Sequence, residues 1–226
     1  MAEPAATVAN PAPGSRRSQG RRGPATREAI HGAALDLFAR LGYHATSMRA
    51  IAAAAKIQPA AIYHWYPSKE AILVGLQDEF MEGLIAEVEA AMAVQHRPAL
   101  KLAAAVREHV VFHGLHRQEA FVTDSEIRAL TEAPRRRLIA QRDAYQATFI
   151  ELIDAGTREG SLQASDARVA AYAILLQCTG VALWFDPDGP RGLDEVADLH
   201  VELVLAALRA SAELIDEATG GGDDAG

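Results

Sequence analysis

The sequence predicts an all-α protein that consists of a small N-terminal three-helix domain and a larger helical body. Half of its 226 residues are hydrophobic, which is enough to build a core, and alanine and leucine predominate. No stretch of the sequence alternates apolar and polar residues as a half-buried strand does. Apolar residues instead recur at spacings of three and four, and residues typical of helix ends separate these runs. Composition, periodicity and helix-end signals therefore agree on the fold class.

The two ends of the chain are predicted to be disordered. The first 24 residues are rich in alanine, proline, glycine and serine, with the basic pairs Arg16-Arg17 and Arg21-Arg22, and cannot bury enough apolar surface to order themselves. The last eight residues form a tail rich in glycine and aspartate. We therefore expect a basic arm at 1–24, the three-helix domain at 25–73, the body at 74–218 and the tail at 219–226.

Three short helices are expected in the first domain. The first covers 26–41 and ends at Gly42, a residue that readily takes the left-handed conformation after a helix. The second opens at Thr46 or Ser47, because both side chains are good N-caps. The third covers 59–66 and starts with a proline, which the first turn of a helix tolerates.

Six further helices are expected in the body. The first of them starts at Lys69, because Pro67 disfavours helical geometry at Tyr66 and Ser68 can cap the next turn. Two prolines and a glycine mark a loop at 186–190. The six helices are expected at 69–94, 98–116, 121–130, 134–160, 166–185 and 193–218.

The net charge of −8 is distributed unevenly between the two parts of the chain. Residues 1–75 hold nine Lys and Arg against four Asp and Glu, which gives 9 − 4 = +5. Residues 76–226 hold the remaining 22 − 9 = 13 basic and 30 − 4 = 26 acidic residues, which gives −13. A basic N-terminal part followed by an acidic body indicates that the N-terminal part binds a polyanion.

The second and third helices are joined by a tight turn and lie behind a first helix, an arrangement typical of a helix-turn-helix DNA-binding domain. In such a domain the N-terminal residues of the last helix reach base edges in the major groove, where small or polar side chains fit. Gln58 and Ala61 are expected to meet bases, and Thr46, Tyr63, His64 and Lys69 to hold phosphates. Short helical hairpins that bind nothing are the alternative. The candidate DNA contacts are Thr46, Ser47, Arg49, Lys56, Gln58, Pro59, Ala60, Ala61, Tyr63, His64 and Lys69.

Residues 26–73 resemble the N-terminal domain of the TetR family of bacterial transcriptional regulators. The residues that carry the resemblance are Ala34, Phe38, Gly42, Thr46, Ser47, Ile51, Ala52, Tyr63, Tyr66, Lys69 and Glu70. Two positions depart from the family pattern: Lys56 replaces a turn glycine, and Gln58 replaces the usual Ser or Thr cap. Lys56 can take the turn geometry or add a phosphate contact, and Gln58 can read adenine. The resemblance implies a cytoplasmic regulator that binds double-stranded DNA at a pseudo-palindromic operator.

The last two expected helices are apolar on more than one face, which predicts a homodimer because their second face must be buried against a second copy. The resemblance adds that such proteins pair these helices in a four-helix bundle. The apolar residues concerned are Val169, Ala173, Leu176, Val181, Trp184, Val196, Leu199, Leu203, Val204 and Leu208.

Aromatic and polar residues of the body are candidates for a ligand-sensing cavity, although aromatics at helical spacing are more often core, and the polar stretch at 124–128 can equally be a solvated edge. Arg128 and the three arginines at 135–137 suggest that a hydrophobic ligand is also acidic, such as a fatty or aromatic acid or its CoA thioester. A multidrug- or metal-responsive regulator is the alternative. The candidate ligand contacts are His109, Phe112, His113, Phe121, Glu126, Arg128, Tyr145, Phe149, Cys178 and Trp184.

Metal binding, cofactor binding and catalysis are expected to be absent. His109, His113 and His116 share a helical face and could ligate a metal with Cys178, but no second ligand pair completes a site, so we expect no metal or cofactor. Cys178 lies in an apolar helix without an adjacent histidine and is expected to be an inert thiol, so the chain is not expected to be an enzyme. No apolar run is expected to reach the length of a membrane span; even 169–185 stops short.

A mechanism follows from the helix that starts at Lys69. A ligand in the body would press on this helix along Leu76, Phe80, Leu84 and Val88, tilt the DNA-binding domain and lower operator affinity.

Overall fold

The computed structural model describes residues 22–220 and places all their regular secondary structure in helices. Most of the basic arm expected at 1–24 and of the tail expected at 219–226 lies outside the described residues. The α-helices are α1 (Arg22–Leu41), α2 (Met48–Ala54), α3 (Lys69–Ala93), α4 (Pro98–Leu115), α5 (Arg117–Ser125), α6 (Glu132–Glu159), α7 (Ala167–Thr179), α8 (Val181–Trp184), α9 (Leu193–Ala207) and α10 (Ala212–Thr219). Two 3-10 turns, η1 (Ala61–His64) and η2 (Glu126–Ala129), complete the order.

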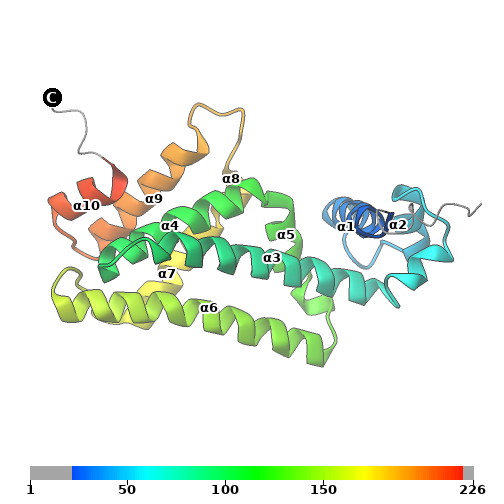
Figure 1. Ribbon diagram of the computed structural model, residues 1–226, viewed down its shortest axis with the longest axis horizontal. Helices are drawn as coiled ribbons and strands as arrows, with labels where there is room; N and C mark the ends of the chain where they lie inside the picture. The colour runs from blue at the N-terminus through cyan, green and yellow to red at the C-terminus, as the bar shows by residue number, and fades with distance from the viewer. Residues whose placement is uncertain (1–21, 221–226) are drawn as a thin grey trace, which may run out of the picture.

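The molecule is elongated, with a small head at one end and a helical body at the other (Figure 1). The head contains α1, α2 and η1, and α3 runs out of it along the whole body. Within the body α4 packs on α3, α9 and α6, and α7 packs on α6 and α4. The long helix α3 therefore joins the two parts, as the sequence predicts.

The predicted helix ends of the head are confirmed. Gly42 takes a left-handed φ of 80°, and its N–H donates to the Phe38 carbonyl at 2.9 Å. The Ser47 hydroxyl accepts from the Ala50 N–H at 3.1 Å and caps α2. The Ser68 hydroxyl accepts from the Ala71 N–H at 3.1 Å and caps α3.

The third predicted helix, at 59–66, is only partly correct, because the chain forms a turn and then a single 3-10 turn at Ala61–His64. Pro59 offers no N–H, and Pro67 restrains the residue before it, so few intrahelical bonds are available between the two prolines. The Ala61 N–H donates to the Gln58 carbonyl at 2.9 Å, and no side chain caps the turn.

Two predicted body helices are each interrupted. The helix expected at 166–185 breaks at Gly180 into α7 and α8. The helix expected at 193–218 breaks into α9 and α10, because Arg209 is left-handed with φ 55° and the Ser211 hydroxyl then caps α10 at the Leu214 N–H, 3.3 Å away. The helix expected at 121–130 begins earlier, at Arg117, and ends in η2.

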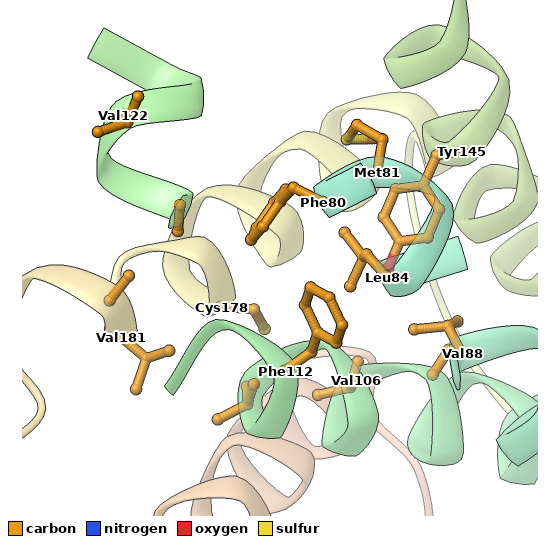
Figure 2. Packing of buried hydrophobic residues seen from close by; sticks show 14 of the residues in the cluster. Phe80, Met81, Leu84, Val88, Val106, Phe112, Val122, Tyr145, Cys178 and Val181 are labelled. Atoms are coloured by element: carbon orange, nitrogen blue, oxygen red, sulfur yellow. The ribbon is translucent and has the colours of Figure 1, made fainter. Parts of the chain in front are cut away.

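The body core is built on the apolar stripe of α3 (Figure 2). Phe80, Leu84 and Val88 are almost fully buried, and the Phe80 ring meets the Phe112 ring of α4 edge-on with centroids 5.3 Å apart. Tyr145 of α6 reaches the same cluster from the other side. Any group that enters this region must therefore displace or contact α3.

One stretch contradicts the expectation that no apolar run reaches membrane length. The 18 residues Ala167–Trp184 have a mean hydropathy of 1.4, and 28% of them are buried in the single chain. The start of this run was placed at residue 169 and not at Ala167, the start of α7, so the run was judged too short to span a membrane. The run spans α7 and α8, which Gly180 interrupts, and its exposed apolar side chains belong to the surface described below.

Candidate functional site

Most residues predicted to contact DNA are exposed on the head. The cations Arg49 and Lys56 are among them, and Ala61 is half-buried. Lys56 has a left-handed φ of 56°, so it does take the turn geometry in place of glycine. The exposed candidates are Ser47, Arg49, Lys56, Gln58, Pro59, Ala60, Tyr63 and His64.

Two predicted phosphate contacts, Thr46 and Lys69, have side chains that already bond inside the head. Thr46 is 3% exposed, and its hydroxyl donates to the carbonyls of Gly42 and Leu37 at 3.0 and 3.3 Å. The Lys69 ammonium donates to the carbonyls of Tyr43 and Thr46 at 2.5 and 2.6 Å and lies 4.1 Å from the centre of the Tyr43 ring. Lys69 thus ties the start of α3 to the loop between α1 and α2.

A polar network joins α1 and α3 at the end of the head. Tyr66 and His31 share a short hydrogen bond between the hydroxyl and Nε2, and His31 Nδ1 lies 2.7 Å from a Glu79 oxygen. Arg27 donates to the Tyr66 hydroxyl at 3.1 Å and to Glu79 at 2.8 Å. Burial raises the pKa of Tyr66, so its hydroxyl stays protonated. This network fixes the angle between the head and α3.

A second connection joins the head to the segment between α5 and α6. The Tyr43 N–H of the head donates to a Glu126 oxygen at 3.1 Å. The Thr131 N–H, just before α6, donates to a Glu70 oxygen at 2.5 Å. The head therefore touches the body through this segment as well as through α3.

The body contains a cavity of about 160 Å³. Part of its wall is apolar, with Phe80, Met81, Leu84 and Leu175. The other part is polar, with His109, His113, Asp124, Arg142, Tyr145, Gln146 and Thr179. Of the predicted ligand contacts, His109, His113 and Tyr145 thus lie together at the cavity.

His109 is at the centre of the polar wall. Its Nδ1 lies 2.8 Å from the Tyr145 hydroxyl, and its Nε2 lies 3.0 Å from the Thr179 hydroxyl. Burial lowers the pKa of His109 well below its ordinary value and raises that of Tyr145 well above it. At the rim, Arg142 of α6 donates to Asp124 of α5 at 2.8 Å. His109 and Tyr145 are therefore neutral inside the cavity, and Arg142 and Asp124 form an ion pair at its edge.

The other predicted ligand contacts do not line this cavity. Phe112, Phe149 and Cys178 are buried behind it, and burial raises the pKa of Cys178 to about 12, which agrees with an inert thiol. Phe121, Arg128 and Trp184 are exposed, and Glu126 faces the head instead. Aromatic periodicity cannot separate a cavity wall from the core behind it, and a role of these residues in ligand binding stays a prediction. Trp184 lines a separate hollow of about 760 Å³ together with residues of α9.

Several cavity residues were missed in the candidate list. Arg142 of α6 is three residues before Tyr145 and four before Gln146, and these two helical spacings are a signal that could have found it and then Gln146. Thr179 gives no such signal, because its role depends on where the end of α7 meets α4.

The histidine stripe of α4 is used for packing and hydrogen bonds. His109 engages both ring nitrogens, His113 stacks on it with centroids 4.1 Å apart, and His116 packs on Phe112. Within residues 22–220 no group of three or more metal-ligating side chains is placed to hold a metal ion.

Two further hollows continue from the cavity along α3 and α6. A cavity of about 130 Å³ shares Tyr145 with the first. It shares Glu89, Met92 and Thr148 with an open groove of about 920 Å³, which includes the start of α4. The three hollows follow one another through shared lining residues, and together they are here called the α3–α6 seam.

The exposed apolar side chains of α7, α8 and α9 form a surface of their own, here called the α7–α9 face. Leu176 is 78% exposed and Leu203 is 61% exposed, although Ile174 and Val204 on the same helices are buried. The helices therefore are apolar on two sides, as predicted. The exposed members are Val169, Tyr172, Leu176, Leu183, Trp184, Leu199 and Leu203.

Comparison with known proteins identifies both parts of the chain. Residues 30–76 match the family model for bacterial regulatory proteins of the tetR family, and residues 95–208 match that for the tetracyclin repressor-like C-terminal domain. The transcriptional repressor KstR2 of Rhodococcus jostii is 26% identical over 77% of this chain and 87% of its own length.

Solved structures show the same fold. A tetR-family regulatory protein from Rhodococcus RHA1 superposes with a TM-score of 0.77 at 28% identity, over 82% of this chain and 98% of that chain. AibR, solved with isovaleryl coenzyme A and operator DNA, gives a TM-score of 0.73 at 26% identity, over 79% and 97%. Such proteins are DNA-binding regulators, not enzymes. The chain, with its helix-turn-helix head and its repressor-like body, belongs to the TetR family of bacterial transcriptional regulators.

Proposed function

We propose that this protein is a dimeric repressor that leaves its operator when a hydrophobic, acidic ligand, such as an acyl-CoA, enters the α3–α6 seam. One observation carries the proposal: the segment from α5 to α6 gives Asp124 to the cavity wall and, two residues later, Glu126 to the Tyr43 N–H of the head. A ligand that moves one contact must strain the other. Such a ligand shifts the equilibrium only if it binds the DNA-free state more tightly.

The acyl-CoA assignment is supported by the shape and charge of the seam. The inner cavity is small and partly apolar, which suits an acyl chain, and the open groove carries His96, Lys101 and Arg158 where a phosphate-rich moiety would emerge. Glu89, Glu151 and Asp154 share that groove, so the cations act locally. The similarity to AibR, solved with isovaleryl coenzyme A, points to the same ligand class.

On the head, the exposed cations and the η1 region are proposed to meet the DNA. Arg49 and Lys56 hold phosphates, and Gln58 reads a base. Trp65, which we did not single out from the sequence, is 39% exposed close to Tyr63 and offers a further backbone contact. The α7–α9 face pairs two copies so that two heads meet a pseudo-palindromic operator.

The proposal is tested with the full chain and an operator selected from random DNA, followed by fluorescence anisotropy. Lys56→Gly keeps the left-handed turn and removes only the charge, so it should weaken binding to all sequences and reduce the salt slope by about one. Gln58→Ala should instead relax the preference at one base pair by about 1–3 kcal/mol. Arg158→Ala, a cation of the distant groove, is the matched control and should leave DNA affinity unchanged.

Induction is tested by adding CoA thioesters of increasing acyl length to the operator complex. We expect release at concentrations near the dissociation constant of each thioester for the free protein. Thioesters that bind the free protein but leave the complex intact at saturation would contradict the induction scheme.

A further inference from the structure

His113 of α4 presents a hydrogen-bond acceptor to the 160 Å³ cavity. Its Nδ1 donates to the His109 carbonyl at 2.9 Å, and because a carbonyl only accepts, the ring hydrogen lies on Nδ1. Burial lowers the pKa of His113 to about 4, so the ring is neutral at neutral pH and Nε2 carries a lone pair. Within residues 22–220 Nε2 has no hydrogen-bond partner, and it is not among the fully enclosed atoms, so it opens onto the cavity.

The chain of Tyr145, His109 and Thr179 presents a donor to the same cavity. The neutral imidazole and the two hydroxyls hold three polar hydrogens, and the two hydrogen bonds between them use two. One hydrogen remains, on Tyr145 if His109 donates from Nδ1, or on Thr179 if it donates from Nε2. Tyr145 and Thr179 both line the cavity, so either tautomer leaves a free hydroxyl hydrogen on a residue of its wall.

His113 and the chain of Tyr145, His109 and Thr179 line the same small cavity, together with apolar side chains. The rings of His109 and His113 are stacked, with centroids 4.1 Å apart and planes 15° apart. The Phe80 ring meets His113 edge-on at 5.4 Å, and Leu84 and Leu175 close the remaining wall. A ligand that fills this space meets one acceptor and one donor on an otherwise apolar surface.

We infer that the ligand of this cavity carries a hydroxyl group on its apolar body, which donates to Nε2 of His113 and accepts from the hydroxyl of Tyr145 or Thr179. A hydroxyl does both, whereas a ketone only accepts and leaves His113 unpaired. A hydrocarbon displaces water from both groups and leaves both unpaired, which a buried site resists strongly. The inference rests on the proposed role of the cavity as the effector site and narrows the effector to a hydroxylated acyl or cyclic compound.

The test uses pairs of small probes of equal shape that fit the cavity without a CoA moiety. Isothermal titration of the full-length protein with phenol and with toluene compares a hydroxyl with a methyl group on the same ring. An apolar cavity of this size prefers hydrocarbons. We expect phenol to bind at least about tenfold more tightly than toluene, because only phenol satisfies both groups.

Single substitutions test which side chains cause the preference for phenol over toluene. His113→Leu removes the acceptor and should reduce the phenol preference to parity or reverse it, whereas His113→Gln keeps an acceptor oxygen and should retain part of it. Tyr145→Phe removes one of the two possible donors at almost constant volume and should reduce the preference severalfold, and it serves as the test if His113→Leu does not fold. Cys178→Ala, buried but outside the cavity wall, is the matched control and should leave the preference unchanged.

The outcomes separate this inference from the proposed function. If toluene binds as well as phenol, or if His113→Leu keeps the preference, the hydroxyl inference is wrong, even where acyl-CoA releases the operator. If phenol is preferred and hexanoyl-CoA and its hydroxylated forms all fail to release the operator, the inference about the cavity holds and the induction proposal fails. If both succeed, a hydroxyhexanoyl-CoA should release the operator at a lower concentration than hexanoyl-CoA.

Discussion

Gln77 occupies the buried side of α3 with 1% of its surface exposed, and its amide Nε2 has no hydrogen-bond partner within the described chain. An enclosed donor without a partner costs about 1–3 kcal/mol of folding free energy. Gln77→Met keeps the length of the side chain and removes the donor, so we expect it to raise the free energy of unfolding by about 1 kcal/mol. Urea unfolding of both proteins measures the difference.

The matched control for this prediction is Gln141→Met on α6, where the amide is only half-buried. It should change stability by less than about 0.5 kcal/mol. Equal effects of the two substitutions would show that methionine acts through helix propensity and not through the lost donor.

His113 makes the stability of the body depend on pH. Its pKa is about 4 in the folded chain and 6.5 in the unfolded one, so between these values the unfolded chain binds more protons. Stability therefore rises with pH through this window, and acidification from pH 6.5 to 4 should remove about 3 kcal/mol. His109 acts in the same direction, because burial also lowers its pKa.

Urea unfolding at pH 7, 6 and 5 tests this dependence. In His113→Gln the loss between pH 7 and 5 should be smaller than in the natural chain. A variant with an unchanged slope would show that groups other than His113 dominate the acid response.

At the scale of elements, the segment that joins α5 to α6 should determine how strongly ligand and DNA oppose each other. Glu126→Ala removes the acceptor for the Tyr43 N–H and leaves Asp124 at the cavity. We expect the ligand-induced loss of operator affinity to fall by about tenfold, within the usual range of coupling energies, while thioester binding to the free protein changes little. Anisotropy titrations with and without hexanoyl-CoA measure both quantities.

Glu132→Ala is the control for this coupling, because Glu132 is exposed on the first turn of α6 and, among residues 22–220, forms an ion pair with Arg136 alone. Equal loss of coupling in both variants would place the connection elsewhere, for example in the Arg27–Tyr66–Glu79 network.

The sequence allowed most elements to be predicted, because caps and prolines act locally. Gly42, Ser47 and Ser68 end or start helices where expected. The breaks at Gly180 and Arg209 were not predicted, since apolar periodicity continues through both and outweighed the local signals of Gly180 and the Ser211 cap. Long, periodic helices therefore are easier to predict than their interruptions.

The site was predictable only in part for a related reason. His109, His113 and Tyr145 stand out as polar groups on apolar faces, and they do line the cavity. Lys69 is a cation beside a helix start, which is equally compatible with a phosphate contact and with the carbonyl contacts that it makes. Whether Lys69 bonds these carbonyls or a phosphate depends on its distance from the loop after α1, and this distance cannot be read from the sequence.

At the scale of the whole molecule, the α7–α9 face should determine the oligomeric state. Leu176→Glu together with Leu203→Glu places two charges on side chains that are 78% and 61% exposed in the single chain and buried in the proposed dimer. We expect a folded monomer by light scattering and a loss of operator affinity of more than about 100-fold, because a single head meets only half of the operator.

Val94→Glu is the control for this prediction, since Val94 is 72% exposed at the end of α3 and belongs to none of the helices of the α7–α9 face. It should remain dimeric and bind DNA normally. A dimer that survives the double substitution would place the subunit contact on another surface.

The separation of the head from the α7–α9 face, visible in Figure 1, has a genetic consequence. A copy with a defective head still folds and still carries an intact pairing surface, so it combines with natural copies in the same cell. If the two copies are made in equal amounts and pair at random, roughly a quarter of the dimers keep two working heads. Head mutations such as Gln58→Ala combined with Arg49→Ala should therefore be dominant and switch on the regulated genes even beside a natural allele. Mutations that destroy the pairing surface should be recessive, because their products never meet the natural protein.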